Sequence, residues 1–322
     1  MPAASPHPST SASPPARNAS ACAPSGHAHQ AWPKAPVSVV VPVKNEAGNL
    51  PRCLEHLQWA DEVFVVDSAS TDGTVEVAQR AGAKVAPFQW NGRYPKKKNW
   101  ALKNLPFRNE WILMVDADEL IPPELAAEIG RAVAAPGPKV GFYINRRFMF
   151  MGKWIRHCGY YPSWNLRLIK KGRGEYEKIA PSGDTKSGDN EVHEHMVCDG
   201  PTGWLKHDMI HEAFATIDVF MEKHNRYSNW EALVQEEGWA GGLRGNPFGH
   251  ALERRRFIKR LARHLPGRPW LRFVYSYILR LGFLDGREGY IFCRLLGIYE
   301  FLCVAKYREL KAGRSARDAQ GL

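Results

Sequence analysis

Residues 111–119 read WILMVDADE, an apolar run that ends in two aspartates, Asp116 and Asp118, separated by one residue. The run predicts a buried strand that delivers both acids to its carboxyl end, where open parallel sheets bind ligands. Two carboxylates held side by side suit a divalent cation, Mg²⁺ or Mn²⁺, and leave coordination positions for water and phosphate oxygens. A solvated acidic turn before a helix is the alternative interpretation of this motif taken alone.

Strand and helix patterns alternate along the chain before this motif. A β-branched run at 37–43 precedes leucines at helical spacing, and a second apolar run at 62–67 ends before a turn rich in Ser and Thr. A third short strand is expected near 84–86. This alternation predicts an α/β fold with a mostly parallel sheet and helices on both faces.

Polar side chains follow three of the expected strands. They are Asn45, Glu46, Asp67, Asp116 and Asp118. Because the carboxyl ends of parallel strands meet along one rim, we expect these side chains to converge on one crevice. The run KKKNW at 96–100 can meet a diphosphate at the mouth of that crevice, although a solvated charge run is its alternative interpretation.

Together, these motifs resemble the inverting family 2 glycosyltransferases of GT-A fold, in particular bacterial lipopolysaccharide core glucosyltransferases and related cell-surface polysaccharide enzymes. The resemblance covers residues 37–227. It is carried by the segments Pro42-Val43-Lys44-Asn45-Glu46, Val66-Asp67-Ser68, Ser70-Thr71-Asp72-Gly73-Thr74 and Asp116-Ala117-Asp118-Glu119. It implies a nucleotide-sugar donor and a divalent cation, Mg²⁺ or Mn²⁺, as cofactor.

The family pattern also implies residue roles. Asp118 binds the metal on the diphosphate, with Asp116 beside it. The nucleotide-sugar site comprises Pro42, Asn45, Glu46, Asp67, Lys98, Asn99 and Asp116. The first four of these hold the base and ribose, and the lysine and the second asparagine lie near the nucleotide.

An aromatic loop at 159–164 lies between two expected strands. Aromatic faces suit the C–H faces of a sugar, so Trp164 and Tyr161 are candidates for an acceptor platform, with ordinary packing beneath a loop as the alternative. Arg167, in the strand that follows, and His211 are further acceptor candidates.

A histidine-rich segment reads VHEHMVC at 192–198 and is followed by two more histidines. Its donors, which are His193, His195, Cys198, His207 and His211, leave a zinc site open as one interpretation. The family resemblance favours another, in which Glu194 is the base that takes the acceptor proton and His193 orients it or the phosphates. His207 would complete the metal shell and His211 would line the site, while hydrogen-bonded structural histidines are the alternative for both.

The last third of the chain combines basic and aromatic residues. An amphipathic helix is expected at 217–237, a Gly-rich linker at 238–250 and a basic, amphipathic helical extension at 251–310. Its apolar stretches are too short and too charged for membrane spans, and they fit an element lying on an anionic membrane surface. Two core helices packed on the sheet domain are the alternative.

Composition bounds the remaining questions. The chain has 322 residues, a net charge of +11 and 44% hydrophobic residues, which suffices for a large core and favours an anionic partner. Six scattered cysteines indicate reduced thiols in a cytosolic protein. We expect tails at 1–35 and 311–322, and a glycosyltransferase domain at 36–237.

These features predict an inverting enzyme that moves a hexose to a lipid-linked bacterial saccharide in lipopolysaccharide core or exopolysaccharide biosynthesis. The favoured hexose is glucose, with UDP-glucose as the donor. It would work peripherally on the inner face of the cytoplasmic membrane. One alternative transfers the sugar to polyprenyl phosphate. The other is a basic membrane- or nucleic-acid-binding protein without catalysis, but no recognisable nucleic-acid-binding motif is present and we expect no nucleic-acid partner.

Overall fold

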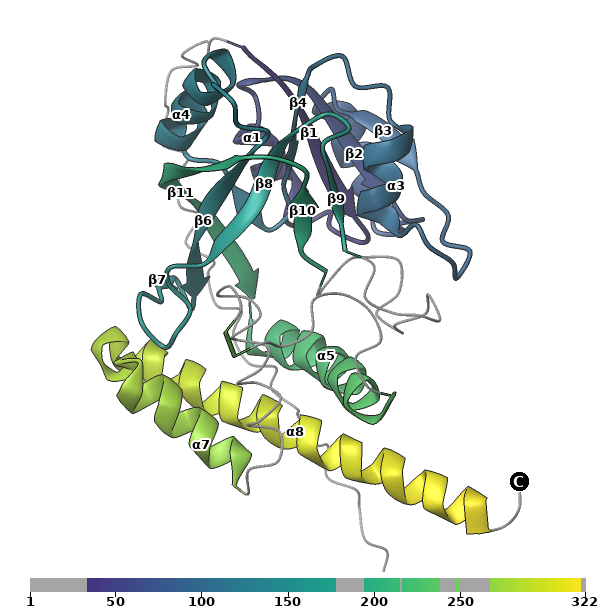
Figure 1. The fold of residues 1–322 in the computed structure, drawn as a ribbon, viewed down its shortest axis with the longest axis vertical. Helices are drawn as coiled ribbons and strands as arrows, with labels where there is room; N and C mark the ends of the chain where they lie inside the picture. The colour runs from purple at the N-terminus through teal and green to yellow at the C-terminus, as the bar shows by residue number, and fades with distance from the viewer. Residues whose placement is uncertain (1–33, 178–193, 215, 238–246, 249–266, 320–322) are drawn as a thin grey trace, which may run out of the picture. The chain divides into compact units, whose positions relative to one another are not determined.

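Four parallel strands form the first half of a nine-stranded sheet (Figure 1). The computed structural model describes residues 34–177, 194–214, 216–237, 247–248 and 267–319. The four strands lie in the order β3-β2-β1-β4, with bounds β1 Ala35–Val43, β2 Ala60–Asp67, β3 Lys84–Pro87 and β4 Trp111–Met114. The helices in this half are α1 Leu50–Glu55, α2 Thr74–Arg80 and α3 Lys97–Asn104.

An antiparallel strand, β8 (Trp164–Lys170), joins this half to the rest of the sheet. The remaining elements are β5 Glu119–Leu120, α4 Pro123–Ala134, β6 Gly141–Phe150, β7 Lys153–Trp154 and β11 Thr202–Phe214. Because β8 is antiparallel to both β4 and β6, and β11 is parallel to β6, six strands run in one direction. The predicted mostly parallel α/β sheet is confirmed. A separate two-stranded sheet pairs β9 (Gly174–Tyr176) with β10 (Met196–Cys198).

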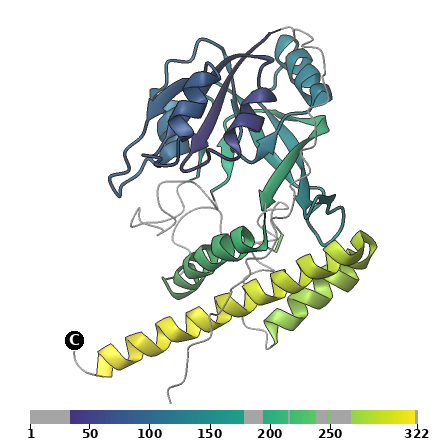
Figure 2. The ribbon, with the colours of Figure 1, turned by 180° about the vertical axis from the view of Figure 1, so that it is seen from behind.

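Both faces of the sheet are covered, as predicted (Figure 2). In β1, Val39 and Val41 belong to a core shared with α1, α2 and α4, whereas Val40 belongs to a second core shared with α3 and β9. A strand with helices on both sides has no solvent face, which explains its unbroken apolar run.

The C-terminal part is helical, also as predicted. Its elements are α5 Ile217–Glu237, α7 Arg268–Val274, the π-helical turn η1 Tyr275–Leu279, the 3₁₀ turn η2 Gly282–Asp285 and α8 Gly286–Ala319. A third core joins Phe148 and Phe150 of β6 to Phe220 of α5 and Phe292 of α8. The last helix continues into the tail expected from residue 311. No helix within the described ranges is long and apolar enough to cross a membrane.

Two expectations for this region fall largely outside the described residues. Most of the linker at 238–250 and the arginine-rich stretch at 254–263 belong to segments that the structure does not describe. Asn246 is among them.

His224 of α5 is buried in an aromatic cluster, stacked on Phe220 with ring centroids 3.7 Å apart. Burial, with a smaller contribution from neighbouring Lys223, lowers the pKa of His224 from 6.5 to about 4. Between these values the unfolded chain binds a proton that the native protein does not, so stability falls as pH falls from 6.5 to 4, by up to about 3 kcal/mol. We expect His224→Phe to flatten this dependence in urea unfolding measured across that range. The control His56→Phe, at a half-buried position, should leave it unchanged, and an unaltered slope in His224→Phe would contradict the assignment.

Candidate active site

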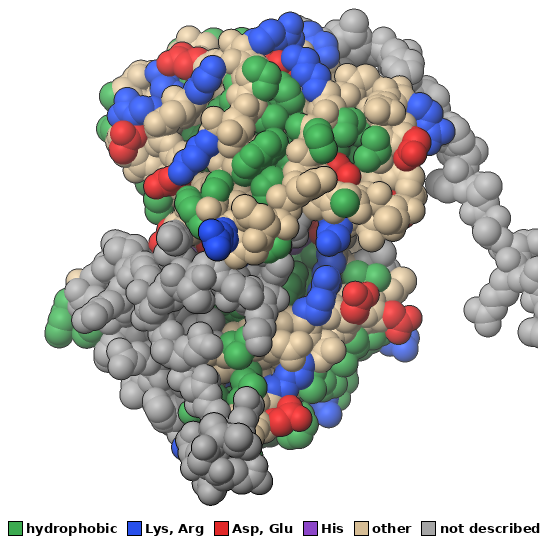
Figure 3. All heavy atoms as spheres, turned by 90° about the vertical axis from the view of Figure 1, so that its right-hand side faces the viewer, with side chains coloured by type: hydrophobic (Ala, Val, Ile, Leu, Met, Phe, Trp, Pro, Cys, Tyr) green, Lys and Arg blue, Asp and Glu red, His purple; other side chains and the backbone are tan. Residues whose placement is uncertain are grey.

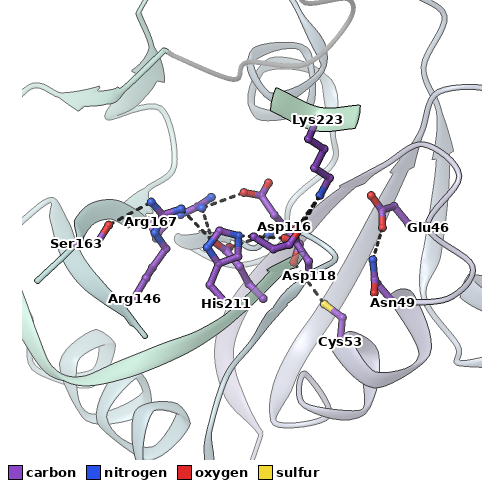
Figure 4. A network of polar contacts seen from close by, with 12 residues as sticks. Glu46, Asn49, Cys53, Asp116, Asp118, Arg146, Ser163, Arg167, His211 and Lys223 are labelled. Atoms are coloured by element: carbon purple, nitrogen blue, oxygen red, sulfur yellow. Dashed lines mark hydrogen bonds and ion pairs between the residues drawn. The ribbon is translucent and has the colours of Figure 1, made fainter. Parts of the chain in front are cut away.

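Asp116 lies just beyond β4 and contacts two cations, of which Figure 4 labels Arg167. Its Oδ1 is 2.8 Å from Lys98 Nζ, and its Oδ2 accepts a hydrogen bond of 2.9 Å from Arg167 Nη2. Burial alone would raise the pKa of Asp116, but the charges of Lys98 and Arg167 outweigh it and hold that pKa well below its usual range. The carboxylate is therefore ionised at neutral pH.

Asp118 faces a different pair of groups. Its Oδ1 is 3.6 Å from His211 Nε2 on β11, and its Oδ2 is 3.3 Å from Lys223 Nζ on α5. Burial opposes ionisation of Asp118, but His211 and Lys223 lower its pKa below the usual value. Asp118 is thus a second ionised acid, and it has an imidazole nitrogen directly opposite.

Glu119 links Asp116 and Arg167 through its buried carboxylate. It is fully buried, its Oε2 accepts the Asp116 backbone N–H at 2.9 Å, and its Oε1 accepts from Arg167 Nη2 at 2.6 Å. Arg146 Nη1 is 3.6 Å from the same oxygen. With these partners, Glu119 fixes the turn that aims the two aspartates.

The loops after β1 and β2 brace one another through side chains. Asn45, at a positive φ of 56°, accepts the Thr71 N–H on its Oδ1 at 2.9 Å, and its own N–H donates to Ser70 Oγ at 2.8 Å. The Glu46 N–H donates to Thr74 Oγ1 at 2.9 Å. The Ser- and Thr-rich turn therefore fixes the loop predicted to hold the nucleoside.

Thr74→Val tests this brace. The substitution keeps the buried shape but leaves the Glu46 N–H without its acceptor, so we expect a loss of about 1–3 kcal/mol in the free energy of unfolding and weaker nucleotide binding. Urea unfolding and calorimetry measure the two effects. Thr71→Val is the matched control, because only the backbone of exposed Thr71 contributes a bond. Equal stability of the two variants would contradict the brace.

Two predicted nucleotide-site acids lie in these loops. Asp67 Oδ2 accepts the Ser70 N–H at 3.1 Å, so it also orders the turn. Burial raises the pKa of Glu46, with Asp118 adding to the shift, while a hydrogen bond from Asn49 opposes it. Glu46 therefore lies close enough to the two aspartates to sense their charge. Pro42 of β1 pairs with Val66 of β2, so it lies next to the end of both strands.

Residues 96–99 are buried instead of forming a solvated charge patch. Lys97 Nζ donates to the Val43 carbonyl at 2.7 Å. Asn99 is fully buried, its Nδ2 donates to the Tyr176 carbonyl at 2.9 Å, and its Oδ1 accepts the Tyr176 N–H at 2.8 Å. The Asn99 amide thus ties α3 to β9, and its contact with the nucleotide stays a prediction. Lys98 faces Asp116, and its nucleotide contact likewise stays a prediction.

Glu194, the predicted base, is paired with a lysine from that run. Its Oε1 is 2.8 Å from Lys96 Nζ, and both side chains are only 6% exposed. His193, predicted to assist it, lies outside the described residues. Lys96 and Glu194 come from segments 98 positions apart, so the pair is a tertiary contact between α3 and the segment before β10.

The two histidines of β11 lie in different surroundings. His207, predicted as a metal ligand, has its Nδ1 2.7 Å from Glu128 Oε2 on α4, and its backbone N–H donates to the same carboxylate. His211, predicted only to line the site, is the histidine at Asp118. Among the described residues, no group of three or more His, Cys, Asp or Glu side chains could hold a metal, and His193 of the zinc interpretation lies outside them.

The acceptor candidates separate as well. Arg167 points to Asp116 and Glu119, so it belongs to the acidic cluster. Tyr161 donates its hydroxyl to Asp208 Oδ2 at 3.1 Å. Trp164 is 41% exposed and remains available for a ligand.

Comparison with known proteins follows this geometry. Residues 38–184 match the model of glycosyl transferase family 2. The chain is 29% identical over 301 residues to the lipopolysaccharide core biosynthesis glycosyltransferase LpsC of Rhizobium meliloti (strain 1021), covering 89% of this chain and 98% of that protein. It is 28% identical to an uncharacterized glycosyltransferase of Rickettsia felis, covering 85% and 89% of the two chains.

Solved structures also resemble this chain at low identity. The mannosyltransferase PcManGT from Pyrobaculum calidifontis, in complex with GDP-Man and Mn²⁺, matches with a TM-score of 0.43 and 16% identity, covering 85% of this chain and 87% of that one. Glucosyl-3-phosphoglycerate synthase from Mycobacterium tuberculosis, in complex with Mn²⁺, UDP and glucosyl-3-phosphoglycerate, matches with a TM-score of 0.36 and 15% identity, covering 65% and 82%.

Proposed function

Because the chain is a family 2 glycosyltransferase, we propose that it moves a hexose onto a lipid-linked bacterial saccharide. The hexose we propose is glucose, with UDP-glucose as the donor. Similarity to LpsC along nearly the whole of both chains supports an acceptor of the lipopolysaccharide core type. The observation that carries the catalytic part of the proposal is the cluster at the end of β4. There, two ionised aspartates stand beside a histidine and three cations.

The donor set at Asp118 fits a divalent cation. A carboxylate oxygen and an imidazole nitrogen face each other across 3.6 Å. The carboxylate is a ligand for Mg²⁺ or Mn²⁺, and the imidazole nitrogen is a ligand for a transition metal such as Mn²⁺. Asp116 is already held by Lys98 and Arg167, so Asp118 and His211 are the residues that would hold the metal. When bound, the cation would neutralise charge on the departing diphosphate.

The protein groups around the cluster have separate tasks. The braced loop from Asn45 to Glu46, with Asp67, binds the nucleoside. Lys98 and Lys223 offset phosphate charge at the mouth of the site. These contacts fix the donor so that the anomeric carbon faces the acceptor.

Glu194 takes the proton from the acceptor hydroxyl. Inversion requires that this hydroxyl attack the face of the sugar opposite to the leaving diphosphate, and a carboxylate positioned beside it raises its nucleophilicity. The Lys96 ammonium holds the Glu194 carboxylate in one orientation. We place this reaction at the inner face of the cytoplasmic membrane, where a lipid-linked acceptor is anchored.

Transfer can be measured with the purified chain, UDP-glucose, Mn²⁺ and lipid-linked core saccharide. We expect the acceptor mass to rise by one hexose and the new linkage, read by NMR, to have the anomeric configuration opposite to that of the donor. Transfer to polyprenyl phosphate instead would support the alternative acceptor. Retention of configuration, or no transfer from any nucleotide sugar, would contradict the proposal.

A further inference from the structure

The C-terminal helices expose an unusual amount of apolar surface. Eleven of the seventeen large hydrophobic side chains that are exposed among the described residues lie between positions 270 and 301. They are Trp270, Leu271, Tyr275, Ile278, Leu279, Leu281, Phe283, Leu284, Tyr290, Ile298 and Phe301. We call these eleven side chains, with Arg280, Arg287 and Arg294, the elbow surface. So many exposed apolar side chains within one stretch of the chain are typical of an interaction site.

The elbow surface is the outer side of a packed helical pair. In Figures 1 and 2, α7 lies alongside the first half of α8, and the two helices are in contact. The inner side of α8 is fully used, since Phe292 and Leu296 pack into the third core. Some outer side chains contact rings of α7 and η1, since the ring of Tyr290 lies 6.0 Å from that of Phe273 and 5.6 Å from that of Tyr277, yet Tyr290 is still 44% exposed.

Along the first half of α8, five exposed positions form one helical stripe. The residues are Arg287, Tyr290, Arg294, Ile298 and Phe301, all exposed and spaced by three or four positions. Such spacing places them on one face of the helix. The stripe alternates arginine with aromatic and aliphatic side chains and contains no acid.

The charge of the elbow is equally one-sided. From residue 268 to 284 the chain contains three arginines and no Asp or Glu. The first acid, Asp285, is buried and accepts the His157 N–H at 2.8 Å. By contrast, basic and acidic side chains are interspersed over the sheet domain in the upper part of Figure 3.

Asp285 also fastens the elbow to the catalytic domain. His157 Nδ1 is 2.8 Å from its carboxylate, and Lys153 Nζ donates to its backbone carbonyl at 2.7 Å. The Cys158 N–H donates to the Arg280 carbonyl at 3.1 Å. This loop continues into β8, which carries Arg167 of the acidic cluster. A surface that holds the elbow would therefore also fix the loop that leads into the site.

We infer that the elbow surface docks onto an anionic phospholipid bilayer, with its aromatic and aliphatic side chains inserted at the interface and its arginines on lipid phosphates. The inference deepens the proposed function, on which it rests for the lipid-linked nature of the acceptor. Aromatic side chains are enriched at the interface of a bilayer, and arginine binds phosphate. A second copy of the chain is less suited as the partner, because the arginines of the two elbow surfaces would meet.

Co-sedimentation with vesicles tests the docking. The full chain should bind vesicles of phosphatidylcholine and phosphatidylglycerol, and bind vesicles of phosphatidylcholine alone at least about tenfold more weakly. The double variant Leu279→Glu/Leu284→Glu should weaken binding about thirtyfold or more. Arg280→Gln/Arg287→Gln should weaken it about thirtyfold on the anionic vesicles at low salt. Trp204→Glu, an exposed apolar position on β11, is the matched control and should bind as the parent does.

Calorimetric binding of UDP-sugars to the same variants separates the two proposals. Unchanged donor binding with lost vesicle binding supports the docking surface and shows that the variants are folded. Vesicle binding that persists in both double variants would overturn the docking surface while leaving the catalytic proposal intact. A parent chain that ignores anionic vesicles, and forms a dimer that Leu279→Glu/Leu284→Glu dissociates, would make the elbow an interface between copies and overturn the inference.

Discussion

Asp118→Ala should lower kcat/KM for sugar transfer at least about a thousandfold at saturating Mn²⁺. The substitution removes the carboxylate that faces His211 across 3.6 Å, so the metal loses one of its two proposed protein ligands. The fold should survive, because the Asp118 carbonyl still accepts the Glu212 N–H and Lys223 still donates to the Ala213 carbonyl.

The control for this variant is Asp61→Ala. Asp61 lies at the start of β2, where its carboxylate pairs with Arg108. Sugar transfer, measured by steady-state kinetics, and Mn²⁺-dependent nucleotide binding should both be lost in Asp118→Ala and retained in Asp61→Ala. Full transfer by folded Asp118→Ala would remove the metal from the mechanism.

Glu194→Gln should bind the donor normally but transfer its sugar about a hundredfold to ten-thousandfold more slowly. The amide keeps the shape of the side chain and can still accept a hydrogen bond from Lys96, so the loss isolates proton transfer from positioning. Calorimetry with UDP-glucose and single-turnover kinetics measure the two properties separately.

Glu175→Gln provides the matched control. Glu175 is an exposed residue of β9 whose carboxylate pairs with Lys103 of α3. Retained turnover in Glu194→Gln would indicate an acceptor that is already an anion, such as polyprenyl phosphate. Lost donor binding in a folded Glu194→Gln would give Glu194 a role at the nucleotide instead.

The parallel strands of the sheet could be predicted because their signals are local. The β-branched run of β1 and the apolar run before Asp116 each specify a buried strand, and short α/β connections make neighbouring strands parallel. The direction of β8 carries no such signal. It pairs with strands on both sides that are distant in sequence, so its antiparallel insertion depends on tertiary packing.

The candidate site divides in the same way. Asp116 and Asp118 were predictable because both follow one strand. Lys223 was not, since it reaches Asp118 from a helix 105 positions away. His207 and His211 share β11 and differ by four positions, but the pairing of β11 with β6 shifts register between Trp204 and Asp208, which no local pattern reveals.

Calorimetric titration with nucleotide sugars, in the presence and absence of Mn²⁺, tests the central claim most directly. The proposed site predicts that one UDP-sugar binds tightly only with the metal, and that His211→Ala weakens this binding whereas His207→Ala does not. Binding of no nucleotide sugar under either condition, by the folded parent chain, would contradict the assignment of the acidic cluster as a donor site.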